Sequence, residues 1–165
     1  MKTFNEKLLI FLVDDDPIYM KVLEAQLTKN YYCSVEKFLT GEDCLAKLSE
    51  KPDIVFLDYY LNTNQKNAWN GLQILEEIKD HNSKIAVVML SIQDQIDVAV
   101  NCMKNGAFDY IVKNETAFVR AQKALRDLCV IRSLKRNVTI ITCIAIIIFI
   151  ISLVLQIWSP NMING

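Results

Sequence analysis

Short apolar runs recur along the first part of the chain and have the length of β-strands. Runs built almost only from Ile, Val, Leu and Phe, with no polar residue at alternate positions, are typical of strands buried on both faces of a sheet. A weaker run, CSVEKF at 33–38, alternates and is expected to be an edge strand. The strong runs are LLIFLV at 8–13, DIVFLD at 53–58, IAVVML at 85–90 and FDYIV at 108–112.

Stretches with helical periodicity separate these runs. Pro17 suits the first turn of a helix and Gly106 suits the C-terminal end of one. Alternating strands and helices predict an α/β fold with helices on both faces of a parallel sheet, and five strands predict a small doubly wound domain. The helical stretches are 17–30, 41–50, 70–80, 94–106 and 115–137.

A continuous apolar segment occupies the C-terminal part of the chain. Residues 138–158 contain no charged side chain, and a helix of that length spans about 31 Å, close to the roughly 30 Å hydrocarbon core of a bilayer. A buried core helix of a soluble protein is usually shorter and keeps a polar stripe, which this segment lacks. Trp158 lies where an interfacial aromatic residue is expected. The pattern predicts one transmembrane helix over 138–158.

The charges beside this segment are asymmetric. Every charged residue of the chain lies at or before Arg136, and the tail at 159–165 has no Lys or Arg. The positive-inside rule therefore puts the N-terminal domain in the cytoplasm, tethered to the inner membrane by a single pass. The apolar run at the N-terminus is too short for a secretory signal. The predicted organisation is a domain over 1–131 with its core at about 7–128, a basic juxtamembrane segment at 132–137, the transmembrane helix and a short non-cytoplasmic tail.

Composition and charge exclude several classes of protein. The formal net charge of −1 lacks the strong basic excess that a nucleic-acid binder usually shows, so no nucleic-acid partner is expected. The five cysteines are odd in number and scattered, which argues against a zinc site or a disulfide framework and favours buried thiols in a reducing compartment.

Polar side chains follow the strong strands where each one ends. In a doubly wound sheet, ligands bind at the carboxyl ends of the strands. Clustered carboxylates repel one another unless a cation intervenes, and hard oxygen ligands favour Mg²⁺. A lysine and a hydroxyl opposite them would supply a cation and a donor for a phosphoryl group. Asp58, alone at its strand end, is the candidate nucleophile. The residues at the strand ends are Asp14, Asp15, Asp16, Asp58, Ser91 and Lys113.

Four short motifs at these strand ends resemble the receiver domain of bacterial response regulators. They occur in the family's order and span about residues 7 to 128, nearly the whole polar part of the chain. The resemblance implies a flavodoxin-like sheet with the strand order 2-1-3-4-5. The motifs are LVDDDP at 12–17, LDYYL at 57–61, MLS at 89–91 and DYIVK at 109–113.

The resemblance implies a phosphoacceptor and a metal site. Asp58 would accept a phosphoryl group from the phosphohistidine of a histidine kinase. Asp14 and Asp15 would hold Mg²⁺ together with Asp58 and the backbone carbonyl of Tyr60. The chain would then be a phosphoacceptor switch and not an enzyme with turnover.

The resemblance also implies a switch beside the phosphoacceptor. Ser91 would donate its hydroxyl to one phosphoryl oxygen and Lys113 would pair with another. Tyr110 matches the aromatic residue whose rotamer couples, with Ser91, to phosphorylation. Asp16 is an additional acid and is interpreted as the cap of the following helix.

The chain departs from the family pattern at three places. The family usually has proline after the lysine, in a cis peptide, where this chain has Asn114. Met-Pro often follows the phosphoacceptor by three and four residues, where this chain has Leu61 and Asn62. The polar loop at 62–71 is also longer than usual.

The leading hypothesis is a membrane-tethered, single-domain response regulator that signals through partner binding. A membrane helix follows the domain, so no DNA-binding output domain is expected, and the surface of its fourth helix, fifth strand and fifth helix would contact a downstream protein. The sequence leaves open whether two copies of the chain form a homodimer. One alternative is a haloacid-dehalogenase-like phosphatase, because Asp14-x-Asp16 also resembles that family's nucleophile motif, with Ser91 and Lys113 at later positions. Another alternative is a receiver-like membrane scaffold that is never phosphorylated.

Overall fold

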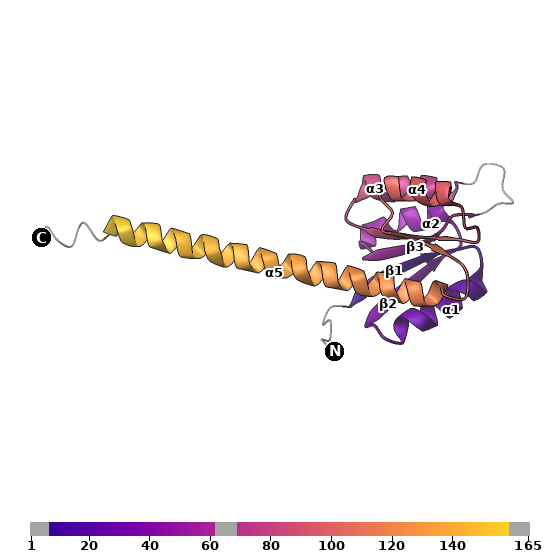
Figure 1. Ribbon diagram of the computed structural model, residues 1–165, viewed down its shortest axis with the longest axis horizontal. Helices are drawn as coiled ribbons and strands as arrows, with labels where there is room; N and C mark the ends of the chain where they lie inside the picture. Colours follow the sequence, from indigo (N-terminus) through magenta and orange to yellow (C-terminus); the bar gives the residue numbers. More distant parts are fainter. Residues whose placement is uncertain (1–6, 62–68, 159–165) are drawn as a thin grey trace, which may run out of the picture. The chain divides into compact units, whose positions relative to one another are not determined.

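A five-stranded parallel sheet with helices on both faces forms the N-terminal part of the protein (Figure 1). The computed structural model describes residues 7–61 and 69–158. The strand order is β2-β1-β3-β4-β5, as predicted, so the fold is a doubly wound α/β domain of the flavodoxin-like type. The elements are β1 (Leu8–Val13), α1 (Pro17–Thr28), β2 (Cys33–Phe38), α2 (Gly41–Ala46), the 3-10 helix η1 (Leu48–Glu50), β3 (Ile54–Asp58), α3 (Gly71–His81), β4 (Ala86–Ser91), α4 (Ile96–Lys104), β5 (Asp109–Val112) and α5 (Ala117–Trp158).

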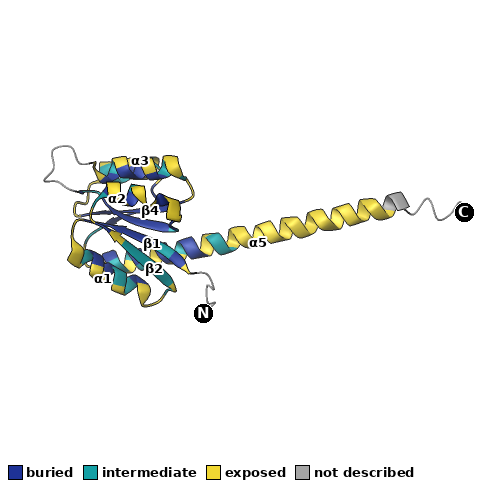
Figure 2. Cartoon of the chain, turned by 180° about the vertical axis from the view of Figure 1, so that it is seen from behind, coloured by how far each residue is buried: buried dark blue, intermediate teal, exposed yellow. Residues whose placement is uncertain are grey.

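The three inner strands are buried and the edge strand β2 is only partly buried (Figure 2). Nearly every residue of β1, β3 and β4 is inaccessible to water because helices cover both faces of the sheet. Four consecutive residues of β2 are half-buried, as its alternating pattern predicted. Burying these apolar strands is the main source of the domain's stability.

Strand register brings the carboxyl ends of the strands to one edge. Val13 pairs with Leu57, Asp58 pairs with Leu90, and Ser91 pairs with Val112. The residues that follow β1 and β5 therefore lie at the same end of the sheet as Asp58 and Ser91, where the sequence predicts the site.

Local capping interactions fix where the helices begin. Asp16 caps α1 by accepting hydrogen bonds from Ile18 N and Tyr19 N at 2.8 and 3.1 Å, and Pro17 occupies the first turn. The interpretation of Asp16 as a cap is therefore confirmed. Asn70 begins α3 with a reciprocal capping box to Gln73.

One predicted helix is shorter in the structure. The periodic stretch 41–50 forms α2 only as far as Ala46, and Leu48–Glu50 continue as a 3-10 turn. Lys51 then adopts a left-handed conformation with φ of 60° and reverses the chain toward β3. The reversal at Lys51 therefore ends the helical stretch before β3.

Gly71 lies directly behind the strand that carries Asp58. A Cβ atom at Gly71 would overlap the backbone carbonyl of Asp58 and lie 2.7 Å from the Tyr59 Cα. Only glycine lets the first turn of α3 approach so closely. This packing holds the end of β3 in place.

The chain divides into two compact units within α5, after Arg126. The helix is unbroken through Trp158, so the predicted helical stretch at 115–137 and the predicted membrane helix at 138–158 form one continuous helix. In the second unit the side chains from Val138 to Leu155 are exposed. By length and composition this helix could cross a membrane. The predicted tail at 159–165 and most of the long loop, including Asn62, lie outside the described residues.

Candidate functional site

Two buried carboxylates and one lysine meet at the carboxyl edge of the sheet. Asp14 follows β1, Asp58 is the last residue of β3, and Lys113 follows β5. Lys113 Nζ lies 2.7 Å from Asp14 Oδ2 and 3.0 Å from Asp58 Oδ1. Asp14 and Asp58 are 1% and 2% exposed. One ammonium group thus bridges two carboxylates that have almost no access to water.

Backbone hydrogen bonds hold the lysine at this position. Lys113 N donates to the Ser91 carbonyl oxygen at 2.7 Å, which continues the pairing of β5 with β4 by one residue. Asn114 N donates to the Val112 carbonyl at 2.8 Å, and the Asn114 Oδ1 accepts from the Thr116 amide at 2.9 Å. All described peptide bonds are trans. Asn114 therefore closes the loop after β5 with side-chain hydrogen bonds where the family usually has proline.

Burial and charge have opposing effects on the pKa values in this cluster. Burial raises the pKa of Asp14 and of Asp58 above the ordinary range, although Lys113 partly opposes the shift. Burial alone would lower the pKa of Lys113, but its hydrogen bond to Asp14 and the charge of Asp58 outweigh that effect and raise it. Among the described residues, one ammonium group faces these carboxylates, which leaves negative charge uncompensated.

The same carboxylates offer a set of ligands for a divalent cation. One oxygen each of Asp14, Asp15 and Asp58 lie within 4.8 Å of one another. Carboxylate oxygens with uncompensated charge are what Mg²⁺ prefers in proteins, so the residues present fit this ion. Asp15 is exposed, so the cluster opens to water on one side.

Neutralising Asp58 is expected to stabilise the fold at neutral pH. Because the folded-state pKa of Asp58 is raised, protonation favours the folded state and the charged form at pH 7 lowers stability. Asp58→Asn should raise the melting temperature at pH 7 by on the order of 3 °C in the presence of a chelator. The difference should shrink at acid pH, where wild-type Asp58 becomes protonated.

Thermal melts followed by circular dichroism across this pH range measure the effect. Glu77→Gln is a matched control, because Glu77 is exposed on α3 and is not one of the carboxylates of the cluster, so its neutralisation should change little. A melting temperature that is lower in Asp58→Asn than in wild type at every pH would contradict the prediction.

Ser91 and Tyr110 meet at the backbone of Gln93. The Ser91 hydroxyl donates to the Gln93 carbonyl at 3.2 Å, and the Tyr110 hydroxyl donates to the same oxygen at 3.0 Å. Tyr110 is 7% exposed and belongs to the core. The structure therefore places these two predicted residues together, with their hydroxyls on Gln93. The Tyr60 side chain also reaches this loop, since its hydroxyl is 2.8 Å from Gln93 Oε1.

Tyr19 is part of this site and was not among the residues predicted from sequence. Lys113 Nζ lies 4.7 Å from the centroid of the Tyr19 ring, over the ring's face, and the Phe118 ring stacks on Tyr19 with 5.5 Å between the centroids. Burial, followed by the charges of Asp14 and Asp58, raises the pKa of Tyr19 to about 12. Its position in the first turn after the Asp14–Asp16 loop was the only signal in the sequence.

The strand order and the acidic site at the strand ends define a flavodoxin-like domain with its site at the carboxyl edge of the sheet. The family model for the response regulator receiver domain matches residues 10–124, and the chain belongs to this family. Receiver domains are phosphoacceptor switches and not classical enzymes. The resemblance of the four strand-end motifs to receiver domains is therefore confirmed.

Curated relatives carry the domain within longer proteins. The transcriptional regulatory protein MalR of Bacillus subtilis is 30% identical over 125 residues, which are 72% of this chain and 48% of MalR. The nitrogen assimilation regulatory protein NtrX of Azorhizobium caulinodans is 32% identical over 105 residues, which are 63% of this chain and 22% of that protein. The chain thus spans less than half the length of these relatives.

Solved structures show the same fold. The BeF₃-activated receiver domain of DrrB superposes with a TM-score of 0.62 and 27% identity, covering 73% of this chain and 99% of that one. NtrX from Brucella abortus superposes with a TM-score of 0.66 and 29% identity, covering 81% of this chain and 30% of that one.

Proposed function

We propose that this receiver domain is phosphorylated on Asp58 by a histidine kinase. The observation that carries the proposal is the buried pair of Asp14 and Asp58 bridged by Lys113. This arrangement places a nucleophilic carboxylate beside a cation that can stabilise the negative charge of a phosphoryl group. An Asp58 oxygen attacks phosphorus, the P–N bond of the phosphohistidine breaks, and the leaving imidazole nitrogen keeps the electron pair and takes up a proton.

The other residues of the site would support this transfer. Asp14, Asp15 and Asp58, with the backbone carbonyl of Tyr60, would hold Mg²⁺, which when bound neutralises charge on the phosphoryl oxygens. Lys113 would move from Asp58 to a phosphoryl oxygen. Ser91 would leave the Gln93 carbonyl and donate to another oxygen, which frees that carbonyl for Tyr110 alone.

The direct test uses the full chain in detergent with a small phosphodonor such as acetyl phosphate. Wild-type protein should gain one phosphoryl group by intact mass, and only with Mg²⁺ present. Omitting Mg²⁺ or adding EDTA should prevent the gain, because the carboxylate cluster then keeps its repulsion toward the donor. Labelling that is equally fast in EDTA would contradict the role given to the metal.

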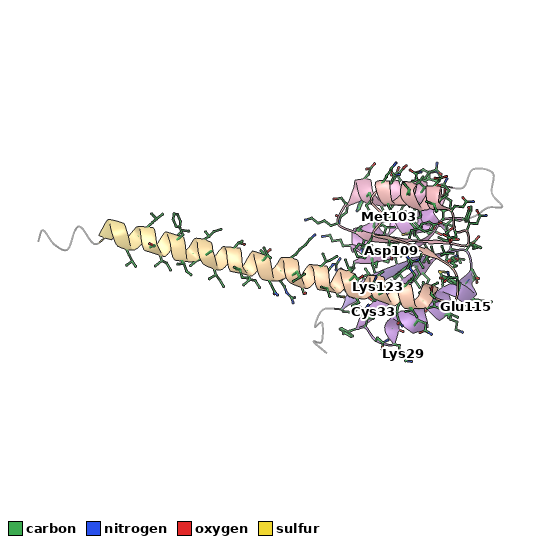
Figure 3. The ribbon with its side chains drawn as sticks, in the orientation of Figure 1. Lys29, Cys33, Met103, Asp109, Glu115 and Lys123 are labelled. Carbon is green, nitrogen blue, oxygen red and sulfur yellow. The ribbon has the colours of Figure 1, made fainter. Side chains whose placement is uncertain are left out.

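The output surface would include α4. Three apolar side chains of α4, at spacings of four and three residues, lie on one face of the helix and are exposed: Ile96 at 77%, Val100 at 44% and Met103 at 48%. Met103 is labelled in Figure 3 on this helix. An exposed apolar face of this kind favours output by binding a downstream protein.

We further propose that residues 138–158 anchor the domain in the inner membrane. The apolar helix and the basic residues before it support this proposal, with 132–137 on the cytoplasmic side and 159–165 on the other. The full chain should stay with membranes after an alkaline carbonate wash, whereas a chain that ends at Arg126, the end of the first compact unit, should be released. Release of the full chain by the wash would contradict the anchor.

A further inference from the structure

The Tyr19 hydroxyl is buried without a hydrogen-bond partner among the described residues. Two other tyrosines show the usual arrangement: Tyr110 donates to the Gln93 carbonyl at 3.0 Å, and Tyr31 donates to the Gln122 carbonyl at 3.2 Å. A buried polar group without a partner lowers the stability of a protein and is uncommon in folded proteins. The Tyr19 hydroxyl would therefore be stabilised by a hydrogen-bond acceptor that enters the site in another state of the protein.

The Tyr19 residue is held by contacts to its ring and by a hydrogen bond at its backbone. Tyr19 N donates to the capping carboxylate of Asp16 at 3.1 Å, which fixes the residue in the first turn of α1. Phe118 stacks on the ring at 5.5 Å, and Lys113 Nζ lies 4.7 Å from the ring centroid. These contacts hold the ring against rotation, so the hydroxyl cannot easily turn outward to bond with water.

The ring and the phosphoacceptor are neighbours of the same ammonium group. Lys113 Nζ, which contacts the Tyr19 ring, is also 3.0 Å from Asp58 Oδ1. Burial, followed by the charges of Asp14 and Asp58, raises the pKa of Tyr19, and the phenol is protonated and able to donate at neutral pH. A phosphoryl group on Asp58 would bring strong acceptor oxygens into this space.

Building on the proposed phosphorylation of Asp58, we propose that Tyr19 is a further phosphoryl-binding residue of the site. Its hydroxyl, which has no partner within residues 7–61 and 69–158, donates a hydrogen bond to a phosphoryl oxygen on Asp58, beside Lys113. The free hydroxyl lowers the stability of the unphosphorylated domain, and the hydrogen bond stabilises the phosphorylated one. Tyr19 thereby shifts the balance toward the phosphorylated state.

The test compares binding of beryllofluoride, a phosphoryl mimic, to the full chain with Mg²⁺ in detergent, by calorimetry. Tyr19→Phe keeps the ring on Phe118 and Lys113 and removes only the hydroxyl. Its beryllofluoride affinity should fall by about tenfold, the usual effect of losing a hydrogen bond to a charged group. Its melting temperature without beryllofluoride should be equal to that of wild type or higher. Tyr32→Phe, at a tyrosine that is 68% exposed, should change neither quantity.

Two results would overturn the assignment. One is equal beryllofluoride affinity in wild type and Tyr19→Phe. The other is a melting temperature that falls equally with and without beryllofluoride, since the hydroxyl would then have a partner, such as a buried water, in both states. Failure of the phosphorylation proposal looks different, because wild-type protein would then fail to bind beryllofluoride at all.

Discussion

Asp58→Asn is expected to reduce covalent phosphorylation of the chain to background. The variant replaces the attacking carboxylate oxygen with a neutral amide of nearly the same shape, so the nucleophile is lost while the packing of β3 is kept. Full-length protein is incubated with Mg²⁺ and acetyl phosphate, and the fraction carrying one phosphoryl group is measured by intact mass over time. Wild type should be labelled on one site.

The control for this variant is Asp94→Asn. Asp94 is exposed in the loop before α4, and its loss should leave the rate of labelling unchanged. The Asp58→Asn protein should still fold, as its melting curve will show. Labelling of Asp58→Asn at a rate close to that of wild type would refute Asp58 as the phosphoacceptor.

Lys113→Met is expected to slow labelling by roughly 100-fold. Methionine keeps most of the stem of lysine but removes the charge that lies 2.7 Å from Asp14 and 3.0 Å from Asp58. Removing one preorganised electrostatic contact from a site of charge transfer typically costs a factor of about 10²–10³ in rate. The initial rate of labelling at saturating Mg²⁺ measures the effect.

Two further measurements separate a chemical role of Lys113 from a structural one. Lys104→Met removes an exposed lysine at the end of α4 and should leave the rate unchanged. The melting temperature of Lys113→Met with Mg²⁺ shows whether the variant is folded under the conditions of the assay. A folded Lys113→Met that is labelled within twofold of the wild-type rate would refute the role proposed for the lysine.

The sequence was sufficient to predict the sheet and the groups at its edge. Apolar runs such as LLIFLV and DIVFLD have few ways to be buried other than as inner strands, and the helical stretches between consecutive strands are long enough for parallel crossovers. Because parallel strands end at one edge, the residues after each run had to lie near one another. The structure places Asp14, Asp58 and Lys113 together there.

Contacts between segments far apart in the chain could not be predicted in this way. Tyr19 belongs to the site because the packing of α1 places the Tyr19 ring against Lys113. Phe118, at the start of α5, stacks on the same ring. The meeting of Ser91 and Tyr110 on the Gln93 carbonyl also depends on how the loop after β4 folds back. Periodicity describes which face a residue lies on, but these contacts depend on how helices pack on the sheet.

The sequence by itself determined the fold class, the strand-end chemistry and the apolar segment at 138–158, because each depends on patterns local to a strand or helix. Only the tertiary structure decided how the charges of the site are paired and which hydrogen-bond donors lie in it. Lys113 is shared between two buried carboxylates, and the nearby Tyr19 hydroxyl has no hydrogen-bond partner in the part of the chain that the structure describes. Both features depend on burial and on contacts between residues that are far apart in the sequence. Burial and these contacts set the free-energy penalty of a charge or hydrogen-bond donor that has no partner.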